Sequence, residues 1–190
     1  MIQSVKPNKD LAKQIKQYEK IVAKKDKKPV DEWIPLPPNP LLPTCVIVDI
    51  DGTLSIRGDR GVYDFKKCGI DTVRHQIKYL LDLINEQNKW IDRQGKTHGL
   101  KIFVFSGRED FFKEETNKWL NDNQIPFDKL YMRRGGDKRN DAIVKQEMYD
   151  KIIRDKYNVF FVIDDRDRVV KMWRSLGLFV FDVNQTGIIY

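Results

Sequence analysis

Short, almost wholly apolar runs alternate with longer amphipathic stretches from residue 45 onward, and this alternation constrains the fold most. The apolar runs cover residues 45–50, 101–106, 130–133, 159–163 and 178–183. Apolar residues recur at helical spacing in the segments 72–91, 110–121, 141–155 and 169–176. Apolar strands separated by helices are typical of a parallel sheet that is covered on both faces. The sequence therefore predicts an α/β domain over residues 44–190.

Residues 1–43 follow another pattern. Leu11, Ile15, Tyr18 and Val22 recur at helical spacing and predict a helix over residues 8–25. The prolines between residues 35 and 43 exclude a helix there and predict an extended linker. Residues 1–40 hold nine lysines against five acids. We expect a solvated appendage that packs loosely on the main domain, and the alternative is an arm that binds nucleic acid or another partner.

Composition limits the class of protein. The chain of 190 residues is 41% hydrophobic and 33% charged, which is typical of a globular domain. No apolar run approaches the roughly 20 residues of a membrane span, and no apolar signal segment follows the polar N-terminus, so we expect a cytoplasmic protein without a membrane partner. The net charge of +7 favours polyanionic partners. Two cysteines, Cys45 and Cys68, suggest reduced thiols rather than a disulfide framework or a zinc site.

Acidic side chains follow two of the predicted strands. Asp49 and Asp51 come at the end of the first strand, and Gly52 allows the backbone to turn sharply beside them. Asp164 and Asp165 end a strand that is otherwise apolar. Ligands of parallel sheets bind beyond the carboxyl ends of the strands. Adjacent acids there are costly without a cation, and Mg²⁺ prefers oxygen ligands, so this pattern predicts a magnesium site. A polar turn that caps a neighbouring helix is the alternative for the first acid pair.

Two further groups could bind a phosphate. Ser106, Gly107 and Arg108 offer a hydroxyl, a backbone amide and a guanidinium after the second strand. Asp141 and Lys145 share one face of a helix, so that the lysine can reach a phosphoryl group and the aspartate can orient it. The structural alternatives are a serine N-cap and a surface ion pair.

These residues occur in a familiar order. Val46-Ile47-Val48-Asp49-Ile50-Asp51-Gly52-Thr53-Leu54, then Ser106, Lys145 and Asp164-Asp165 resemble the four motifs of the haloacid dehalogenase (HAD) phosphatase superfamily over residues 44–185. The resemblance implies a HAD-like Rossmannoid three-layer fold. Because residues 54–71 are too few for a large cap domain, we expect a minimal cap and an open site.

A narrower resemblance is to the 3′-phosphatase domain of phage polynucleotide kinase/phosphatase. It is carried by the segments 58–68, 106–109, 139–145, 163–166 and 169–177. The resemblance implies a 3′-phosphate end of DNA or RNA as substrate, with a separate kinase or ligase left open as a partner, and the host cytoplasm as compartment if the chain is phage-encoded. No G-x-x-x-x-G-K-[ST] loop occurs, so no 5′-kinase activity is expected from this chain.

The resemblance also implies a role for each site residue. Asp49 would be the nucleophile that forms an aspartyl-phosphate, and Asp51 the general acid and then the general base. Mg²⁺ would be held by Asp49, the carbonyl of Asp51, and Asp164, with Asp165 on a metal-bound water or the loop. Ser106 and Lys145 would contact the phosphoryl oxygens. The remaining expected substrate-binding residues are Thr53, Arg60, Gly107, Arg108 and Asp141.

Several readings remain open at this point. The basic residues Arg133, Arg134, Lys138 and Arg139 could form a groove for a nucleic-acid backbone or a solvated loop. A nucleotidase or other small-molecule phosphatase of the same fold is the first alternative function. A non-catalytic nucleic-acid-binding or scaffold protein is the second, and the complete set of acids, serine and lysine argues against it.

Overall fold

The centre of the molecule is a parallel sheet of five strands in the order β5-β4-β1-β6-β7. The structure is a computed structural model that describes residues 9–25, 35–94 and 99–184. Its strands are β1 (Thr44–Val48), β4 (Lys101–Glu109), β5 (Lys129–Arg133), β6 (Asn158–Asp164) and β7 (Val180–Asp182). All four neighbouring pairs are parallel, so the predicted α/β sheet is confirmed.

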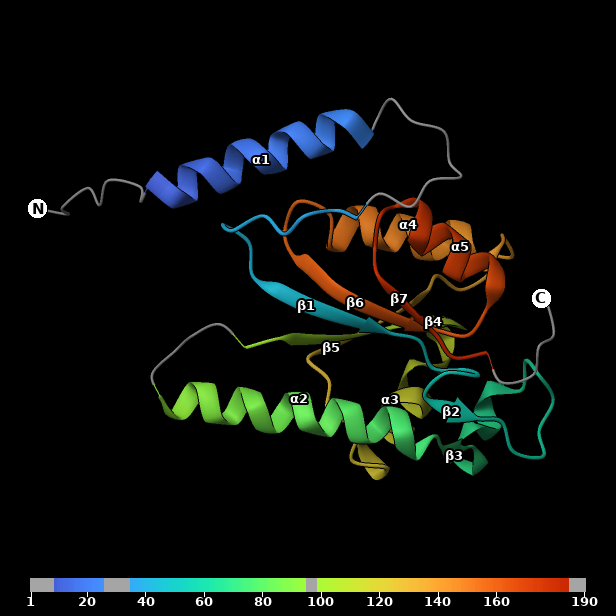
Figure 1. Cartoon of the computed structure of the whole chain (residues 1–190). Helices are drawn as coiled ribbons and strands as arrows, with labels where there is room; N and C mark the ends of the chain where they lie inside the picture. Colours follow the sequence, from blue (N-terminus) through green and yellow to red (C-terminus); the bar gives the residue numbers. More distant parts are fainter. Residues whose placement is uncertain (1–8, 26–34, 95–98, 185–190) are drawn as a thin grey trace, which may run out of the picture.

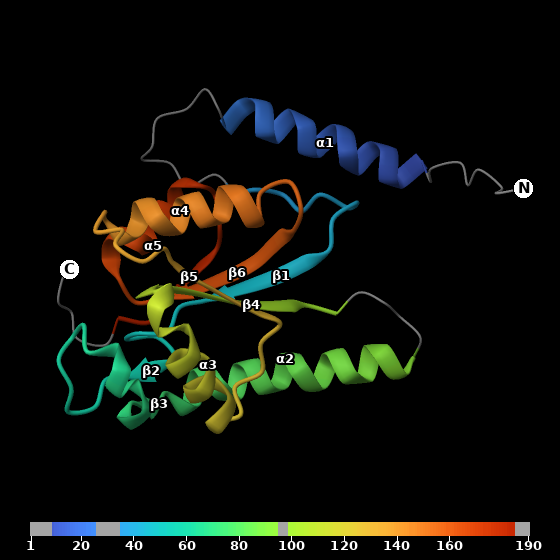
Figure 2. The same cartoon turned by 180° about the vertical axis from the view of Figure 1, so that it is seen from behind.

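Successive side chains of β1 point to opposite faces of the sheet, and each face has its own hydrophobic core. Val46 and Val48 join a buried cluster with residues of α2 (His75–Arg93) and α3 (Lys113–Asp122). Cys45 and Ile47 lie in a second cluster, together with residues of α4 (Asp141–Ile152) and α5 (Asp167–Ser175). Figures 1 and 2 show these two helix layers on opposite sides of the strands. The three-layer arrangement brings the carboxyl ends of β1, β4 and β6 to one edge.

A small cap follows β1. Strand β2 (Ser55–Ile56) pairs antiparallel with β3 (Thr72–Val73), and the 3₁₀ helix η1 (Phe65–Ile70) lies between them. The helix predicted over 72–91 is therefore wrong at its start. Thr72 and Val73 pair with β2, and the backbone is still extended at Arg74, so the helix begins only at His75.

Two parts of the N-terminal segment are described, residues 9–25 and residues 35–43. Helix α1 (Lys9–Lys25) lies outside the α4–α5 layer in both views (Figures 1 and 2). Residues 35–43 are not helical, as predicted, but residues 40–42 form a turn rather than an extended chain, and the stretch is anchored to the sheet domain. The Leu36 amide donates to the Gly177 carbonyl at 2.9 Å, and the Asn158 side-chain amide donates to the carbonyls of Asn39 and Leu42. Residues 26–34 of the predicted basic run and linker lie outside the described residues.

None of the helices described here combines the length and apolar character that a membrane crossing requires.

Candidate active site

A buried lysine joins two of the predicted acids. Lys145 Nζ lies 2.7 Å from Asp49 Oδ1 and 2.9 Å from Asp164 Oδ2. Helix α4 supplies the lysine, while Asp49 directly follows β1 and Asp164 ends β6. Burial alone would lower the pKa of Lys145, but Asp164 and Asp49 outweigh it and raise that pKa above its usual range. Lys145 is therefore a fixed cation at the carboxyl end of the sheet.

Three carboxylates meet at the same place. Asp49, Asp164 and Asp165 each offer an oxygen, and these oxygens lie within 4.8 Å of one another. Thr53 Oγ1 donates to Asp165 Oδ1 at 2.9 Å, and Trp173 Nε1 donates to Asp164 Oδ2 at 3.2 Å. Burial, opposed by Lys145, raises the pKa of Asp49. An all-oxygen donor set of this kind suits a hard divalent cation such as Mg²⁺.

Glycine is required where the first loop passes the acid cluster. Gly52 has a φ of +88°, and a Cβ at this position would overlap the Asp165 carboxylate. Both observations favour a residue without a side chain. The close approach holds the loop after β1 directly against the end of β6.

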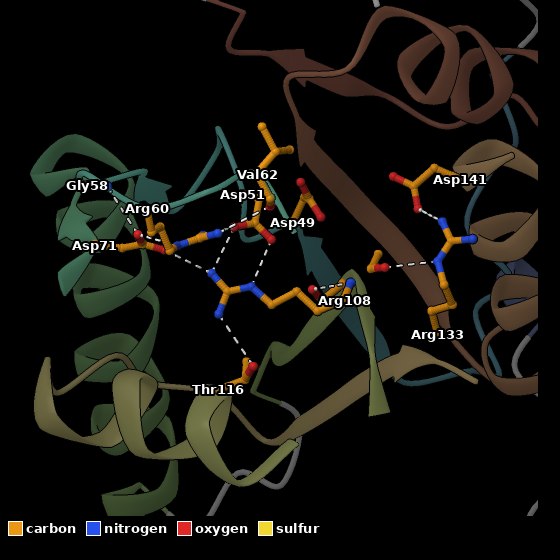
Figure 3. A network of polar contacts seen from close by, with 12 residues as sticks. Asp49, Asp51, Gly58, Arg60, Val62, Asp71, Arg108, Thr116, Arg133 and Asp141 are labelled. Atoms are coloured by element: carbon orange, nitrogen blue, oxygen red, sulfur yellow. Dashed lines mark hydrogen bonds and ion pairs between the residues drawn. The ribbon is translucent and has the colours of Figure 1, made fainter. Parts of the chain in front are cut away.

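The Asp51 carboxylate is held by two guanidinium groups (Figure 3). Arg108 donates from Nε and Nη2, each at 2.8 Å, and Arg60 Nη2 donates at 3.0 Å. Both arginines also contact Asp71, whose side chain is fully buried. The two guanidinium groups lie over the Phe65 ring, each 5.3 Å from its centroid. We expected Arg60 and Arg108 to bind the substrate. In the structure, both arginines donate hydrogen bonds to Asp51.

Ser106 and Gly107 lie at an irregularity of β4, between Ser106 and Glu109. Ser106 is fully buried, and its Oγ accepts a hydrogen bond from the Arg108 amide at 3.2 Å. A Cβ on Gly107 would lie 2.5 Å from Asp141 Oδ1. The missing side chain at Gly107 therefore lets β4 approach the first turn of α4.

Asp141 binds arginines rather than Lys145. Arg133 Nη2 donates to it at 2.8 Å and Arg166 Nη1 at 3.0 Å. Burial would raise the pKa of Asp141, but Lys145, Arg166 and Arg133 together lower it. We expected Asp141 to orient Lys145. Within the described residues no hydrogen bond joins the two, so Asp141 acts on the lysine through its charge.

The structure thus brings Asp49, Lys145, Asp164 and Asp165 together and places Asp51 beside them. It also adds residues that the sequence did not single out, namely Asp71, Phe65, Arg166 and Trp173. Asp71 is a lone acid between η1 and β3, without a patterned neighbour, so no local signal marks it. Trp173 has the spacing of an ordinary core residue of α5, which conceals its hydrogen bond to Asp164.

The basic loop after β5 divides into two groups. Arg133 also donates to the carbonyls of Gly107, Asp137 and Arg139, and Arg139 pairs with Asp137 and Glu147. The side chains of Arg133 and Arg139 therefore both have hydrogen-bonded or ionic partners within the protein. Arg134 and Lys138 are exposed, and neither side chain has a recorded ionic or hydrogen-bonded partner in the described part of the chain.

A parallel sheet with acidic side chains at the carboxyl ends of β1 and β6, and a buried lysine from α4 between them, is the arrangement of a HAD-type phosphatase domain. Residues 43–187 match the family model described as the phosphatase domain of polynucleotide kinase PNKP. The chain belongs to this family.

Individual relatives agree with this assignment. The putative bifunctional polynucleotide kinase/RNA ligase of Autographa californica nuclear polyhedrosis virus is 33% identical over 137 residues, which are 72% of this chain and 18% of the viral protein. A chain in the structure of the Pnkp1/Rnl/Hen1 RNA repair complex superposes with a TM-score of 0.73 at 33% identity, covering 83% of this chain and 48% of that one. A chain of a second Pnkp1/Rnl/Hen1 complex gives 0.71 at 34% identity, with 80% and 50% covered. This chain therefore spans half or less of these relatives.

Proposed function

We propose that this protein is a Mg²⁺-dependent polynucleotide 3′-phosphatase that removes the terminal phosphate of DNA or RNA through an aspartyl-phosphate on Asp49. The observation that carries the proposal is the Lys145 ammonium 2.7 Å from Asp49, beside three clustered carboxylates, in a chain of the PNKP phosphatase-domain family. Healing of nucleic-acid ends is the corresponding biological role.

The proposed reaction has two displacements. An Asp49 oxygen attacks phosphorus, the bond from phosphorus to the 3′-oxygen breaks, and its electron pair leaves with that oxygen, which takes a proton from Asp51. Water then attacks phosphorus, gives a proton to Asp51, and releases phosphate and the free Asp49 carboxylate. Lys145 offsets phosphoryl charge, and Ser106 donates to a phosphoryl oxygen.

The carboxylates of Asp49, Asp164 and Asp165, with the carbonyl of Asp51, would hold the magnesium ion. Bound there, the ion would supply charge neutralisation for the approach of one anion to another. Thr53 and Trp173 keep two of these carboxylates oriented through their hydrogen bonds. Arg108 and Arg60 fix the Asp51 carboxyl group through their ion pairs. Asp141 would contribute through Arg133 and Arg166, with which it forms ion pairs at 2.8 and 3.0 Å.

Three considerations support a nucleic-acid end as the substrate. The matching family is named for a polynucleotide kinase, and the viral relative is named a polynucleotide kinase/RNA ligase. The solved relatives belong to an RNA repair complex, so a separate kinase or ligase is a proposed partner. The exposed side chains of Arg134 and Lys138 provide positive charge that is not paired with any acidic side chain among the described residues. The sequence contains no G-x-x-x-x-G-K-[ST] loop, so 5′-kinase activity is not part of the proposal.

Phosphate release tests this function directly. The substrates are an oligonucleotide with a 3′-phosphate, its 5′-phosphate isomer and a 3′-mononucleotide, each with MgCl₂, and Asp49→Asn is the control. We expect release mainly from the 3′-phosphate oligonucleotide and a loss of several orders of magnitude in Asp49→Asn. Equal or faster release from the mononucleotide would favour a nucleotidase. Substantial turnover by Asp49→Asn would exclude the aspartyl-phosphate.

A further inference from the structure

Two aromatic side chains near the site are exposed instead of joining the core. Tyr63 is 83% exposed and Phe111 is 72% exposed. Tyr63 lies in the cap, just before η1, and Phe111 lies in the 3₁₀ helix η2 (Asp110–Phe112), which directly follows β4. Rings this exposed contribute little apolar burial to folding.

Tyr63 is attached to the residues that hold Asp51. Arg60 Nη2 donates to Asp51, while Nη1 of the same guanidinium donates to the carbonyls of Gly61 and Val62, both at 3.2 Å. Figure 3 draws Val62 and Asp51 as partners of Arg60 in one network of polar contacts. The Tyr63 ring meets Phe65 edge-on, with centroids 6.5 Å apart. The main chain that carries this exposed ring is therefore positioned by the same arginine that positions the proposed general acid.

Phe111 is supported from behind by the basic loop. A Cβ on Gly135 would overlap the Phe111 ring, so the ring lies directly against the glycine backbone. The amides of Gly135 and Gly136 donate to Asp110 and Glu109, each at 2.8 Å, and tie this loop to the start of η2. One side of the ring thus rests on backbone, and the rest is open to solvent.

The unpaired cations Arg134 and Lys138 lie in the same loop, which follows β5. Arg134 directly precedes Gly135, and Lys138 follows two residues after Gly136. Neither side chain is paired within the described residues, whereas Arg133 and Arg139 are. Exposed rings beside unpaired cations are the combination by which proteins bind single-stranded nucleic acid, because bases stack on the rings and phosphates contact the cations.

We propose that Tyr63 and Phe111 are stacking platforms for the bases of the substrate's terminal nucleotides, with Arg134 and Lys138 on the adjacent backbone phosphates. This inference rests on the proposed function and makes it more specific. The terminal 3′-phosphate occupies the site at Asp49, and the strand leaves it between the cap and the loop after β5. Polymer ends are then preferred over small phosphate esters, because only a polymer engages both rings and the cations.

The test compares a short single-stranded 3′-phosphate oligonucleotide with p-nitrophenyl phosphate, which has no nucleobase. Tyr63→Ala and Phe111→Ala should each raise KM for the oligonucleotide about 5-fold or more, the lower limit for one lost base stack. Both variants should retain wild-type kcat/KM on p-nitrophenyl phosphate. Tyr63→Phe keeps the ring and should behave as wild type. Trp90→Ala, at a 51% exposed aromatic of α2, is the matched control and should leave both substrates unchanged.

An equal loss on both substrates would overturn the inference, because the rings would then act through the structure of the site. Unchanged KM for the oligonucleotide in both alanine variants would overturn it as well. The wild-type enzyme tests the proposed function separately. If it hydrolyses p-nitrophenyl phosphate but not the oligonucleotide, the polynucleotide function fails and the inference on the rings fails with it. If it hydrolyses the oligonucleotide and both alanine variants keep the wild-type KM, the inference alone fails.

Discussion

Arg108 donates two hydrogen bonds to Asp51, from Nε to one carboxylate oxygen and from Nη2 to the other, both at 2.8 Å. The arginine side chain is fully buried, and its Nη2 also lies 3.2 Å from Asp71. A two-point contact fixes the direction of the carboxyl group as well as its position. Arg108, which we expected to bind substrate, therefore positions the carboxyl group of Asp51, the proposed general acid.

Replacing Arg108 by lysine should separate charge from geometry. Lysine keeps the positive charge but cannot bind both oxygens of Asp51 in a fork. We expect Arg108→Lys to lower kcat by about 10²-fold, the typical effect of a small misplacement of a catalytic group. Arg154→Lys, at an exposed ion pair with Asp150, is the matched control and should retain wild-type kcat. Steady-state kinetics measures both, and a wild-type kcat in Arg108→Lys would contradict a geometric role.

Two glycines with positive φ allow strain to be separated from collision. A Cβ at Gly52, with φ +88°, overlaps the Asp165 carboxylate, whereas a Cβ at Gly136, with φ +80°, meets nothing within 4 Å. Both alanine variants should lose about 1–3 kcal/mol of unfolding free energy from the backbone conformation. Only Gly52→Ala should also lose phosphatase activity, since it displaces Asp165. Urea denaturation and phosphate release measure the two effects, and equal activity in both variants would contradict the prediction.

Magnesium should stabilise the protein, because the single charge of Lys145 only partly neutralises the three carboxylates that lie within 4.8 Å of one another. A ligand that binds only the folded state raises its stability by mass action. We expect MgCl₂ to raise the Tm of chelator-treated protein, and Asp165→Asn to show a smaller rise at the same concentration. Differential scanning fluorimetry measures the Tm. Potassium chloride at equal ionic strength is the control, and an equal rise with that salt would argue against a specific site.

Cys45 should be unreactive in the folded protein. It is fully buried on the sheet, and burial raises the pKa of its thiol from the ordinary 9.0 to about 12. The unfolded chain therefore loses this proton at a lower pH than the folded protein does. The contribution of Cys45 to stability is complete below about pH 9 and is lost as the pH rises toward about 12.

Two measurements check this expectation. A thiol reagent at neutral pH should modify Cys45 only after urea is added, and Cys45→Ala should reduce the fall in unfolding free energy between pH 8 and pH 10, in the direction set by linkage. Rapid modification of native Cys45 would show that the thiol is accessible.

Much of the fold could be predicted from the sequence, because the patterns that indicate strands and helices are local. Apolar runs and helical spacing predicted every strand of the main sheet and every α-helix, with ends that differ by a few residues. The short β2–β3 hairpin was missed, because Ser55–Ile56 and Thr72–Val73 are too short for an alternation to appear. Their pairing joins segments that lie apart in the chain, and it shortened the helix predicted from residue 72.

The candidate site divides in the same way. The sequence determined which acids and which serine stand at the ends of strands and which lysine lies in a following helix, because the carboxyl ends of parallel strands meet at one edge of the sheet. Only the tertiary structure decided which partner each charge has. In the structure, Lys145 forms ion pairs with Asp49 and Asp164. Asp141 pairs with Arg133 and Arg166, and Arg108 pairs with Asp51 and Asp71. Ion pairs depend on distances of a few ångströms between side chains far apart in sequence, and only the folded packing determines those distances.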